Sequence, residues 1–92
     1  MISSFKNRET QELYEKGSTR RFAAFARVAL RKLDMIAAAS VVETLRVPPG
    51  NRLESLKGDR AGQWSIRIND QWRICFNWRG SNAENVEIVD YH

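Results

Sequence analysis

The feature that most constrains the fold is a change in hydrophobic period close to Gly62. Before this glycine, apolar residues recur three or four positions apart, and after it they alternate with polar residues. The first pattern is that of a helix buried along one side, and the second is that of a strand with one buried face. Helices followed by consecutive strands predict an α+β fold in which helices cover one face of an antiparallel sheet.

Capping residues divide the helical half of the chain. Asn7 can cap a helix over residues 8–16, and Gly17 can end it. A longer helix is expected over about residues 19–39, because apolar residues form one stripe along it. The stripe consists of Phe22, Phe25, Ala26, Ala29, Leu33, Ile36 and Ala37.

A short third helix is predicted next, because Ser40 and Glu43 have the spacing of a capping box. Its end should come near Arg46, where two prolines and a glycine follow within a few residues. The stretch 53–60 is interpreted as a connector.

Strands are expected over about residues 63–68, 72–78 and 85–92, with a polar loop at 79–84. Residues 2–5 could add an edge strand. The sequence therefore predicts a small antiparallel sheet, made of an N-terminal strand and a three-strand meander, packed against two or three helices.

Size and composition limit the possible classes of protein. Ninety-two residues with 42% apolar content predict a single domain over residues 1–92. No apolar run is long enough to span a bilayer, and no signal peptide follows Met1, so a cytoplasmic location without a membrane partner is expected. The single cysteine, Cys75, rules out an internal disulfide, and with His92 as the single histidine no zinc site, metal or other cofactor is expected.

Positive charge is concentrated in two regions. Residues 16–33 contain six basic residues and no acid, and residues 57–79 contain five basic residues and two acids. Such regions on a small domain favour a polyanionic partner. The candidate RNA contacts in the first region are Arg20, Arg27 and Arg31; the alternative is a solvated basic helix.

The predicted hairpin register produces an electrostatic conflict. If Ile66 faces Ile74, Arg67 lies directly opposite Arg73, and like charges in that position destabilise a strand pair. An ion pair with Glu87 on the next strand would relieve the conflict. The other explanation is an anionic ligand, since arginine matches phosphate oxygens in charge and geometry.

The last predicted strand includes three residues that can exchange protons or accept hydrogen bonds: Asp90, Tyr91 and His92. Tyr91 has the parity of Glu87 and should face the arginines, whereas His92 could equally be a frayed, solvated residue. With Lys57 and Arg73 holding a phosphate, these residues suit RNA cleavage by the substrate's own 2′-hydroxyl, which requires a base, an acid and charge stabilisation but no metal.

The segment LKGDRAGQWSIRINDQWRICFNW, the closing VDYH, and MISSFKN with the later YEKG resemble the HigB toxins of bacterial toxin–antitoxin systems, in the RelE superfamily. The resemblance covers most of the chain. It implies a RelE-like fold and a ribosome-dependent mRNA interferase that cuts the codon in the A site of the 30S subunit, inhibiting translation. It also implies a HigA-type helix-turn-helix antitoxin, through which the complex would bind operator DNA.

The resemblance also implies residue roles. Lys57 and Arg73 match residues that contact the scissile phosphate, and Asp90, Tyr91 and His92 match residues implicated in proton transfer and nucleotide positioning. Arg60 lies in the matching motif and could be as much structural as RNA-binding.

Two positions depart from the family pattern. Some HigB proteins have histidine where this chain has Glu54, and a basic residue can occur at the position of Asn69; we infer that Arg67 supplies that charge. A relative that binds the ribosome, RNA and antitoxin but cleaves poorly is the main alternative. A simple nucleic-acid-binding module is the third.

Overall fold

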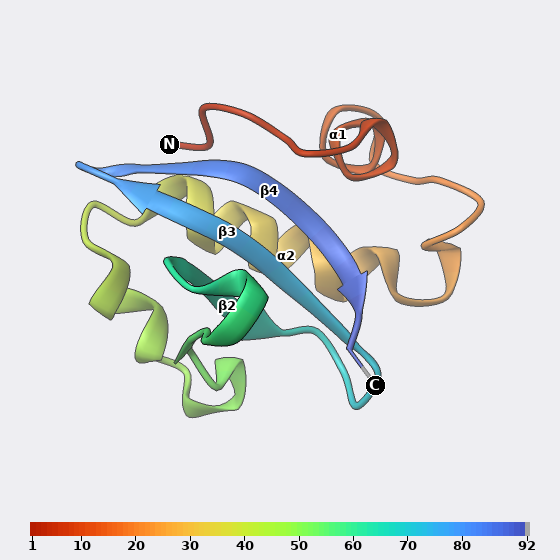
Figure 1. The fold of residues 1–92 in the computed structure, drawn as a ribbon. Helices are drawn as coiled ribbons and strands as arrows, with labels where there is room; N and C mark the ends of the chain where they lie inside the picture. The colour runs from red at the N-terminus through yellow and green to blue at the C-terminus, as the bar shows by residue number, and fades with distance from the viewer. Residues whose placement is uncertain (92) are drawn as a thin grey trace.

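A four-stranded antiparallel sheet in the order β1-β2-β3-β4 forms one layer of the molecule, and helix α2 crosses one of its faces (Figure 1). The computed structural model describes residues 1–91, so His92 lies outside the described residues. The helical elements are α1 (Arg8–Lys16), η1 (Ala23–Phe25), α2 (Ala26–Ala38), η2 (Val42–Arg46), η3 (Pro49–Asn51) and η4 (Gly58–Arg60), where η denotes a 3-10 turn. The strands are β1 (Glu54–Ser55), β2 (Gln63–Arg67), β3 (Trp72–Arg79) and β4 (Asn82–Asp90). The predicted α+β class is confirmed.

Helix α1 has the predicted bounds because its two ends are capped locally. The side chain of Asn7 accepts a hydrogen bond from the Thr10 N–H at 2.9 Å. Gly17 adopts a left-handed conformation (φ 87°) and its N–H returns to the Leu13 carbonyl at 2.8 Å. The buried Thr10 hydroxyl then accepts a hydrogen bond from the Ile88 N–H at 3.1 Å, which joins the helix to β4.

Helix α2 begins later than predicted. The expected start near residue 19 is wrong, because η1 precedes α2 and Phe25 has non-helical angles (φ −132°, ψ 21°). Phe22 and Phe25 pack instead on Trp72, with ring centroids 5.8 and 5.2 Å from it. Their helical spacing in the sequence therefore reflects packing on the sheet and not a continuous helix.

The core lies between α2 and the sheet. Ala29, Leu33 and Ile36 of the predicted apolar stripe are completely buried, as are Ile66 and Ile74 of the sheet. Full burial of a leucine or isoleucine side chain contributes about 1.5–3 kcal/mol. This face of the sheet is consequently closed by the helix, and the opposite face carries the polar residues.

The short third helix ends at Arg46 as predicted but is a 3-10 helix, and the predicted capping box is wrong. Residues Val42–Arg46 form a 3-10 turn, no side chain caps its start at Val41, and the Thr44 hydroxyl donates to the Val41 carbonyl at 2.8 Å. Pro48 follows closely, and the residue before a proline is disfavoured in the α region. The segment has no room for α-helical turns and forms tighter 3-10 turns instead.

The β2–β3 hairpin has the predicted register. Ile66 pairs with Ile74 and Arg67 pairs with Arg73. Asn69 closes the loop, because its side-chain oxygen accepts hydrogen bonds from the N–H groups of Gln71 and Trp72 at 2.9 and 2.8 Å. Asn69 therefore has a structural role in this chain.

Strand β4 is longer than predicted. The polar loop expected over residues 79–84 is wrong, because β3 continues to Arg79 and β4 starts at Asn82 after a short turn. A register shift opposite Cys75 and Asn77 adds one residue to β4. The bulge explains the missed strand, since it interrupts strict alternation while keeping Ala83 and Val86 buried.

The edges of the sheet also differ from the expectation. The connector predicted over residues 53–60 contains β1, which pairs with β2. Residues 2–5 do not form a regular strand; Ile2 and Phe5 make isolated parallel bridges with Ala83 and Val86. Within residues 1–91, no helix is long and apolar enough to cross a membrane.

Candidate active site

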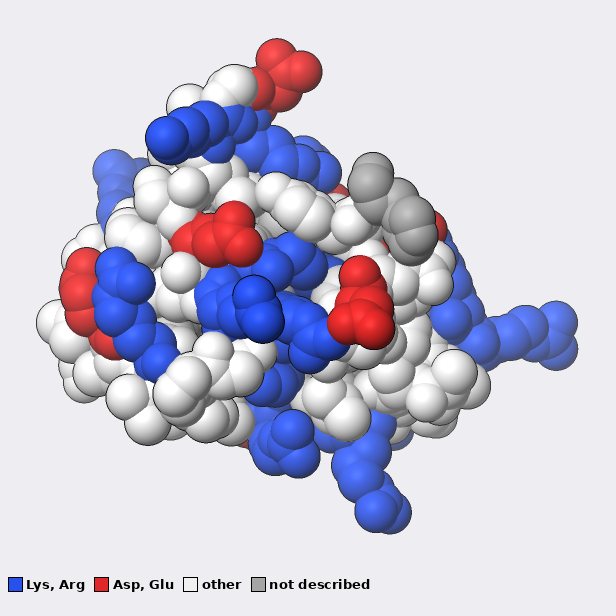
Figure 2. Space-filling view, turned by 90° about the horizontal axis from the view of Figure 1, so that it is seen from below, with Lys and Arg blue, Asp and Glu red and all other residues white. Residues whose placement is uncertain are grey.

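A polar pocket opens beside the β2–β3 hairpin, on the face of the sheet that α2 leaves free. Its lining residues are Arg52, Glu54, Arg67, Asn69, Asp70, Arg73 and Tyr91. Figure 2 shows basic side chains gathered at the centre of this side of the molecule, with acidic side chains on both sides of them. The pocket thus combines the facing arginines of the hairpin with a residue from the end of β4.

Arg73 forms the fixed floor of the pocket. Its residue is only 7% exposed. Its Nε donates to Ser65 Oγ at 2.9 Å, and its Nη2 donates to the carbonyl oxygens of Arg52 and Ser65 at 2.6 and 3.4 Å. Nη1 lies 3.4 Å from Glu54 Oε1. The guanidinium is therefore held on three sides by the protein itself.

Tyr91 lies against this guanidinium. The Cζ of Arg73 is 5.5 Å from the centre of the Tyr91 ring, within the range of a cation–π contact. The Tyr91 N–H donates to the Gln71 carbonyl at 2.6 Å, which ties the end of the chain's last strand to the hairpin loop. The predicted orientation of Tyr91 toward the arginines is confirmed.

The conflict between Arg67 and Arg73 is resolved by separate partners. Arg67 forms an ion pair with Asp70 in the hairpin loop, whereas Arg73 leans toward Ser65 and Glu54. The predicted ion pair of these arginines with Glu87 is wrong. The β3–β4 register places Glu87 opposite Cys75, two residues along the strand from Arg73, which pairs with Val89.

Glu87 instead anchors Arg60. Its Oε1 accepts from Arg60 Nη1 at 3.0 Å and lies 3.6 Å from Lys6 Nζ. The hydrogen bond to Glu87 raises the pKa of Arg60, which also donates to Gln63 Oε1 at 3.0 Å. Arg60 does not line the pocket; its contacts attach η4 to the open face of the sheet.

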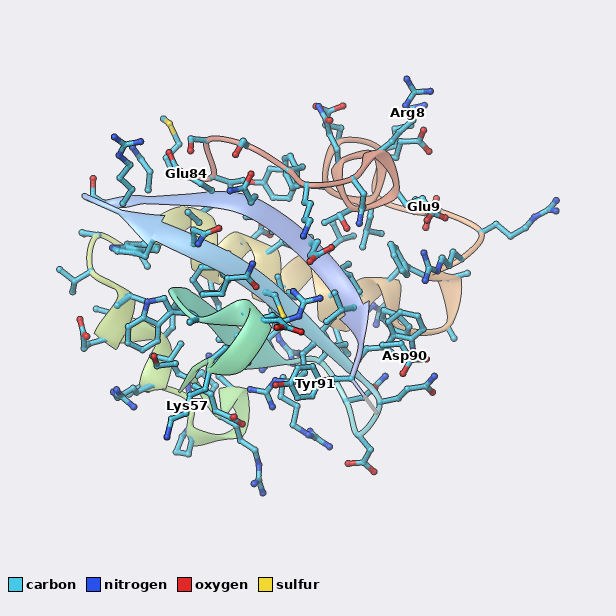
Figure 3. All side chains as sticks on the ribbon, in the orientation of Figure 1. Arg8, Glu9, Lys57, Glu84, Asp90 and Tyr91 are labelled. Carbon is cyan, nitrogen blue, oxygen red and sulfur yellow. The ribbon has the colours of Figure 1, made fainter. Side chains whose placement is uncertain are left out.

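Lys57 and Asp90 lie outside the pocket lining. Lys57 is exposed next to η4, and Figure 3 shows it apart from Tyr91. Asp90 accepts a hydrogen bond from Gln71 Nε2 at 3.0 Å. In Figure 3 the side chains of Asp90, the last residue of β4, and of Tyr91 point in different directions.

The basic residues of the helical half form a separate surface. Arg20, Arg27 and Arg31 are exposed, and none of them lines the pocket. Arg27 and Arg31 belong to α2, which covers the opposite face of the sheet. The structure therefore does not bring these three residues together with Arg73 and Tyr91.

Sequence reasoning missed Arg52 and the buried Lys32. Lys32 is 6% exposed and donates to Asn51 Oδ1. Burial lowers the pKa of Lys32, and the charges of Arg31 and Arg67 lower it further. The sequence offers only a weak signal for Arg52. The preceding Pro-Pro-Gly-Asn segment predicts a turn but does not indicate that the Arg52 side chain lines a pocket.

Cys75 is buried in β3, and its pKa is raised by that burial first and by Glu87 among its charged neighbours. A thiol of this kind is a poor nucleophile at neutral pH. The structure therefore shows Cys75 as a packed, free thiol.

Comparison with known proteins identifies the family. The sequence pattern described as "RelE-like toxin of type II toxin-antitoxin system HigB" matches residues 3–92. The chain belongs to the HigB family. Toxin HigB-1 of Vibrio cholerae serotype O1 (strain ATCC 39315 / El Tor Inaba N16961) is 38% identical over 90 residues, covering 96% of this chain and 95% of the relative. Endoribonuclease HigB of Proteus vulgaris is 36% identical over 94 residues, covering both chains completely.

Solved structures confirm the RelE-like fold of this HigB protein. A chain of the YoeB–YefM complex from Staphylococcus aureus matches with a TM-score of 0.58 at 16% identity, over 100% of this chain and 98% of that one. YafQ from E. coli matches with a TM-score of 0.56 at 11% identity, over 98% and 93%. This HigB protein is a toxin of a type II toxin–antitoxin system, and its partner is an antitoxin.

Proposed function

We propose that this HigB toxin is an endoribonuclease that cuts mRNA in the ribosomal A site and thereby stops translation. The observation that carries the proposal is the pocket in which the fixed guanidinium of Arg73 meets Arg67 and Tyr91. The name of the Proteus vulgaris relative supports the activity, since it is an endoribonuclease at 36% identity over the full length.

The proposed reaction uses the nucleophile of the substrate. The 2′-hydroxyl oxygen forms a bond to the adjacent phosphorus, and the bond from phosphorus to the 5′-oxygen breaks. The products are a 2′,3′-cyclic phosphate and a 5′-hydroxyl. One group accepts the proton of the 2′-hydroxyl, another donates a proton to the leaving 5′-oxygen, and cationic donors stabilise the phosphate oxygens. No metal is required for any of these steps.

Arg73 and Tyr91 are suited to two of these roles. Arg73 lines the pocket, and its Nη1 can donate to a phosphate oxygen at the place now taken by Glu54. The exposed Tyr91 lies within reach of the same space and supplies a hydroxyl for proton transfer. We assign Asp90 and His92 to positioning or proton transfer, and Lys57 and Arg60 to RNA contact and to support of η4.

The proposed partners follow from the family. mRNA on the 30S subunit is the substrate, and a HigA-type helix-turn-helix antitoxin neutralises the toxin and carries the complex to operator DNA. The net charge of +4 and the exposed Arg20, Arg27 and Arg31 favour association with ribosomal RNA. We expect the protein to act in the cytoplasm as a single domain.

Glu54 favours a second candidate function. Its carboxylate lies 3.4 Å from Nη1 of Arg73 in the same pocket lining, and an acid at a phosphate site opposes binding of the substrate. A toxin limited in this way would bind the ribosome and the antitoxin but cleave poorly.

Expression without an antitoxin distinguishes the two functions. The endoribonuclease predicts growth arrest, with mRNA cut inside codons and 5′-hydroxyl ends at the cuts. Growth arrest with intact mRNA would contradict cleavage and support the poorly cleaving alternative.

A further inference from the structure

We propose that Arg52 is a phosphate-binding residue of this pocket and that its ligand is a phosphodiester of single-stranded RNA next to the scissile one. The inference rests on the proposed function in taking RNA as the ligand. The two arginines differ in their free N–H donors: Arg73, which is assigned to the scissile phosphate, has few, whereas Arg52 has many.

Arg73 has little left to offer a second phosphate. A guanidinium carries five N–H donors. Those of Nε and Nη2 are directed to Ser65 Oγ and to the carbonyl oxygens of Arg52 and Ser65. Only the Nη1 side remains for a ligand, so Arg73 can serve one phosphate and cannot also hold the next one along the RNA.

Arg52 has the opposite character. Its side chain is exposed and lines the pocket together with Arg67 and Arg73. Within residues 1–91, no ion pair and no hydrogen bond engages its guanidinium. Among the described residues its five donors therefore have no protein partner, and the side chain lies in a polar pocket, where a planar fork suits the oxygens of a phosphate.

The backbone of Arg52 is held in place from the core. Arg52 adopts the left-handed conformation (φ 46°, ψ 56°), which is uncommon for a residue other than glycine. The preceding Asn51 is completely buried, and its Nδ2 donates to the Leu45 carbonyl at 3.0 Å while its Oδ1 accepts from Lys32. Unusual backbone at a pocket, fixed by its surroundings, is typical of functional positions.

The main chain of Arg52 also contacts Arg73, the residue assigned to the scissile phosphate. Its carbonyl oxygen accepts the 2.6 Å hydrogen bond from Arg73 Nη2. One residue thus orients Arg73 through its main chain and presents its own cation to the pocket. Glu54 and Asp70 hold the Nη1 side of Arg73 and the Nη2 side of Arg67, so Arg52 is the cation that a phosphate reaches without displacing a carboxylate.

Three variants test the role of the side chain. Asn is tolerated in the left-handed region, so Arg52→Asn removes the charge and keeps the carbonyl that holds Arg73. Arg52→Lys restores the charge. Arg79→Asn is the matched control, since Arg79 is exposed at the far end of β3 and does not line the pocket.

The probe is a short, fully 2′-O-methylated single-stranded oligoribonucleotide, which cannot undergo 2′-hydroxyl attack. Its binding is followed by fluorescence anisotropy between about 50 and 200 mM salt. Loss of one phosphate contact on a single strand should reduce the slope of log K against log salt by about 0.7. We expect this reduction for Arg52→Asn, and the wild-type slope for Arg79→Asn and Arg52→Lys, with equal thermal midpoints throughout.

An unchanged slope for Arg52→Asn, or an equal reduction for Arg79→Asn, overturns the assignment of Arg52. Failure of the wild-type protein to bind the probe at the lowest salt overturns the phosphate site as a whole. Wild-type protein that binds the probe with the Arg52-dependent slope but leaves mRNA on ribosomes intact would remove the proposed function and leave this inference standing.

Discussion

Replacing Glu87 by glutamine should destabilise the fold, because Glu87 fastens the 58–60 turn to the sheet. Glu87 is 8% exposed and accepts a hydrogen bond from Arg60 Nη1 at 3.0 Å. Glutamine has nearly the same shape and can still accept one hydrogen bond from Arg60. The substitution therefore removes the negative charge and leaves the packing in place.

The size of the effect follows from the two kinds of hydrogen bond. A hydrogen bond to a charged group contributes about 1.5–3 kcal/mol and a neutral one about 0.5–1.5 kcal/mol. The difference is about 1 kcal/mol, toward the lower end because the Arg60 side chain is 36% exposed and is screened by solvent. The exposed Lys6 adds at most a few tenths. For a chain of this size, 1 kcal/mol lowers the thermal midpoint by about 4–8 °C.

Thermal and urea unfolding of Glu87→Gln and Glu84→Gln measures this effect. Glu84 lies on the same strand (Figure 3) and takes part in no ion pair within the described part of the chain, so its variant controls for the change in net charge. We expect a lower midpoint for Glu87→Gln only. Equal midpoints for the two variants would refute the conclusion that the Arg60–Glu87 pair holds the turn on the sheet.

Three further predictions concern buried polar groups. Burial lowers the pKa of Lys32 below its ordinary value of 10.5, so the unfolded chain binds that proton more tightly than the folded one, and the free energy of unfolding should rise as pH rises toward 10.5. The urea midpoint of Lys32→Met should lack this rise. Urea midpoints of the two proteins that change in parallel with pH would contradict the prediction. Arg73→Lys should lower the free energy of unfolding measured in urea by about 1–3 kcal/mol, because lysine cannot donate to both Ser65 Oγ and the Arg52 carbonyl. An unchanged free energy of unfolding would contradict the conclusion that these hydrogen bonds hold Arg73 in place. Cys75 should react with iodoacetamide far more slowly in the folded protein than in urea, since it is buried with a raised pKa; equal rates would contradict its burial.

The parts of the fold predicted correctly are those set by local signals or by strict alternation. Helix α1 has a capping asparagine before it and a glycine after it, and both act within one turn. The β2–β3 register follows from alternation, since a slip by one residue would expose Ile66 and Ile74. In each case a short stretch of sequence is enough to determine the helix bounds or the strand register.

The parts predicted wrongly depend on distant contacts. Phe22 and Phe25 have helical spacing, but their packing on Trp72 breaks the helix before Ala26. The two-residue strand β1 is too short to have a period of its own. The bulge in β4 interrupts the alternation that the prediction relied on.

The same distinction applies to the site: residues placed by strand alternation were predicted, and residues placed by irregular segments were not. Strand parity was enough to place Tyr91 with Arg73, because Val89 pairs with Arg73 and Tyr91 comes two residues after Val89. The partner of Glu87 was not predictable, since Arg60 reaches it from an irregular turn. Arg52 was missed for the same reason, because its position depends on the buried Asn51 and a left-handed backbone.

Cleavage of a defined mRNA on purified ribosomes tests the central claim most directly, with wild-type protein and Tyr91→Phe compared side by side. Phenylalanine keeps the ring beside Arg73 and removes only the hydroxyl proposed to transfer a proton. We predict that the wild-type protein cuts inside the A-site codon and leaves a 5′-hydroxyl. The cleavage rate of Tyr91→Phe should be lower by a factor of at least about 100, as for loss of a general acid or base. No cleavage by the wild-type protein, a 5′-phosphate at the cut, or full activity of Tyr91→Phe would contradict the account of this pocket as the active site.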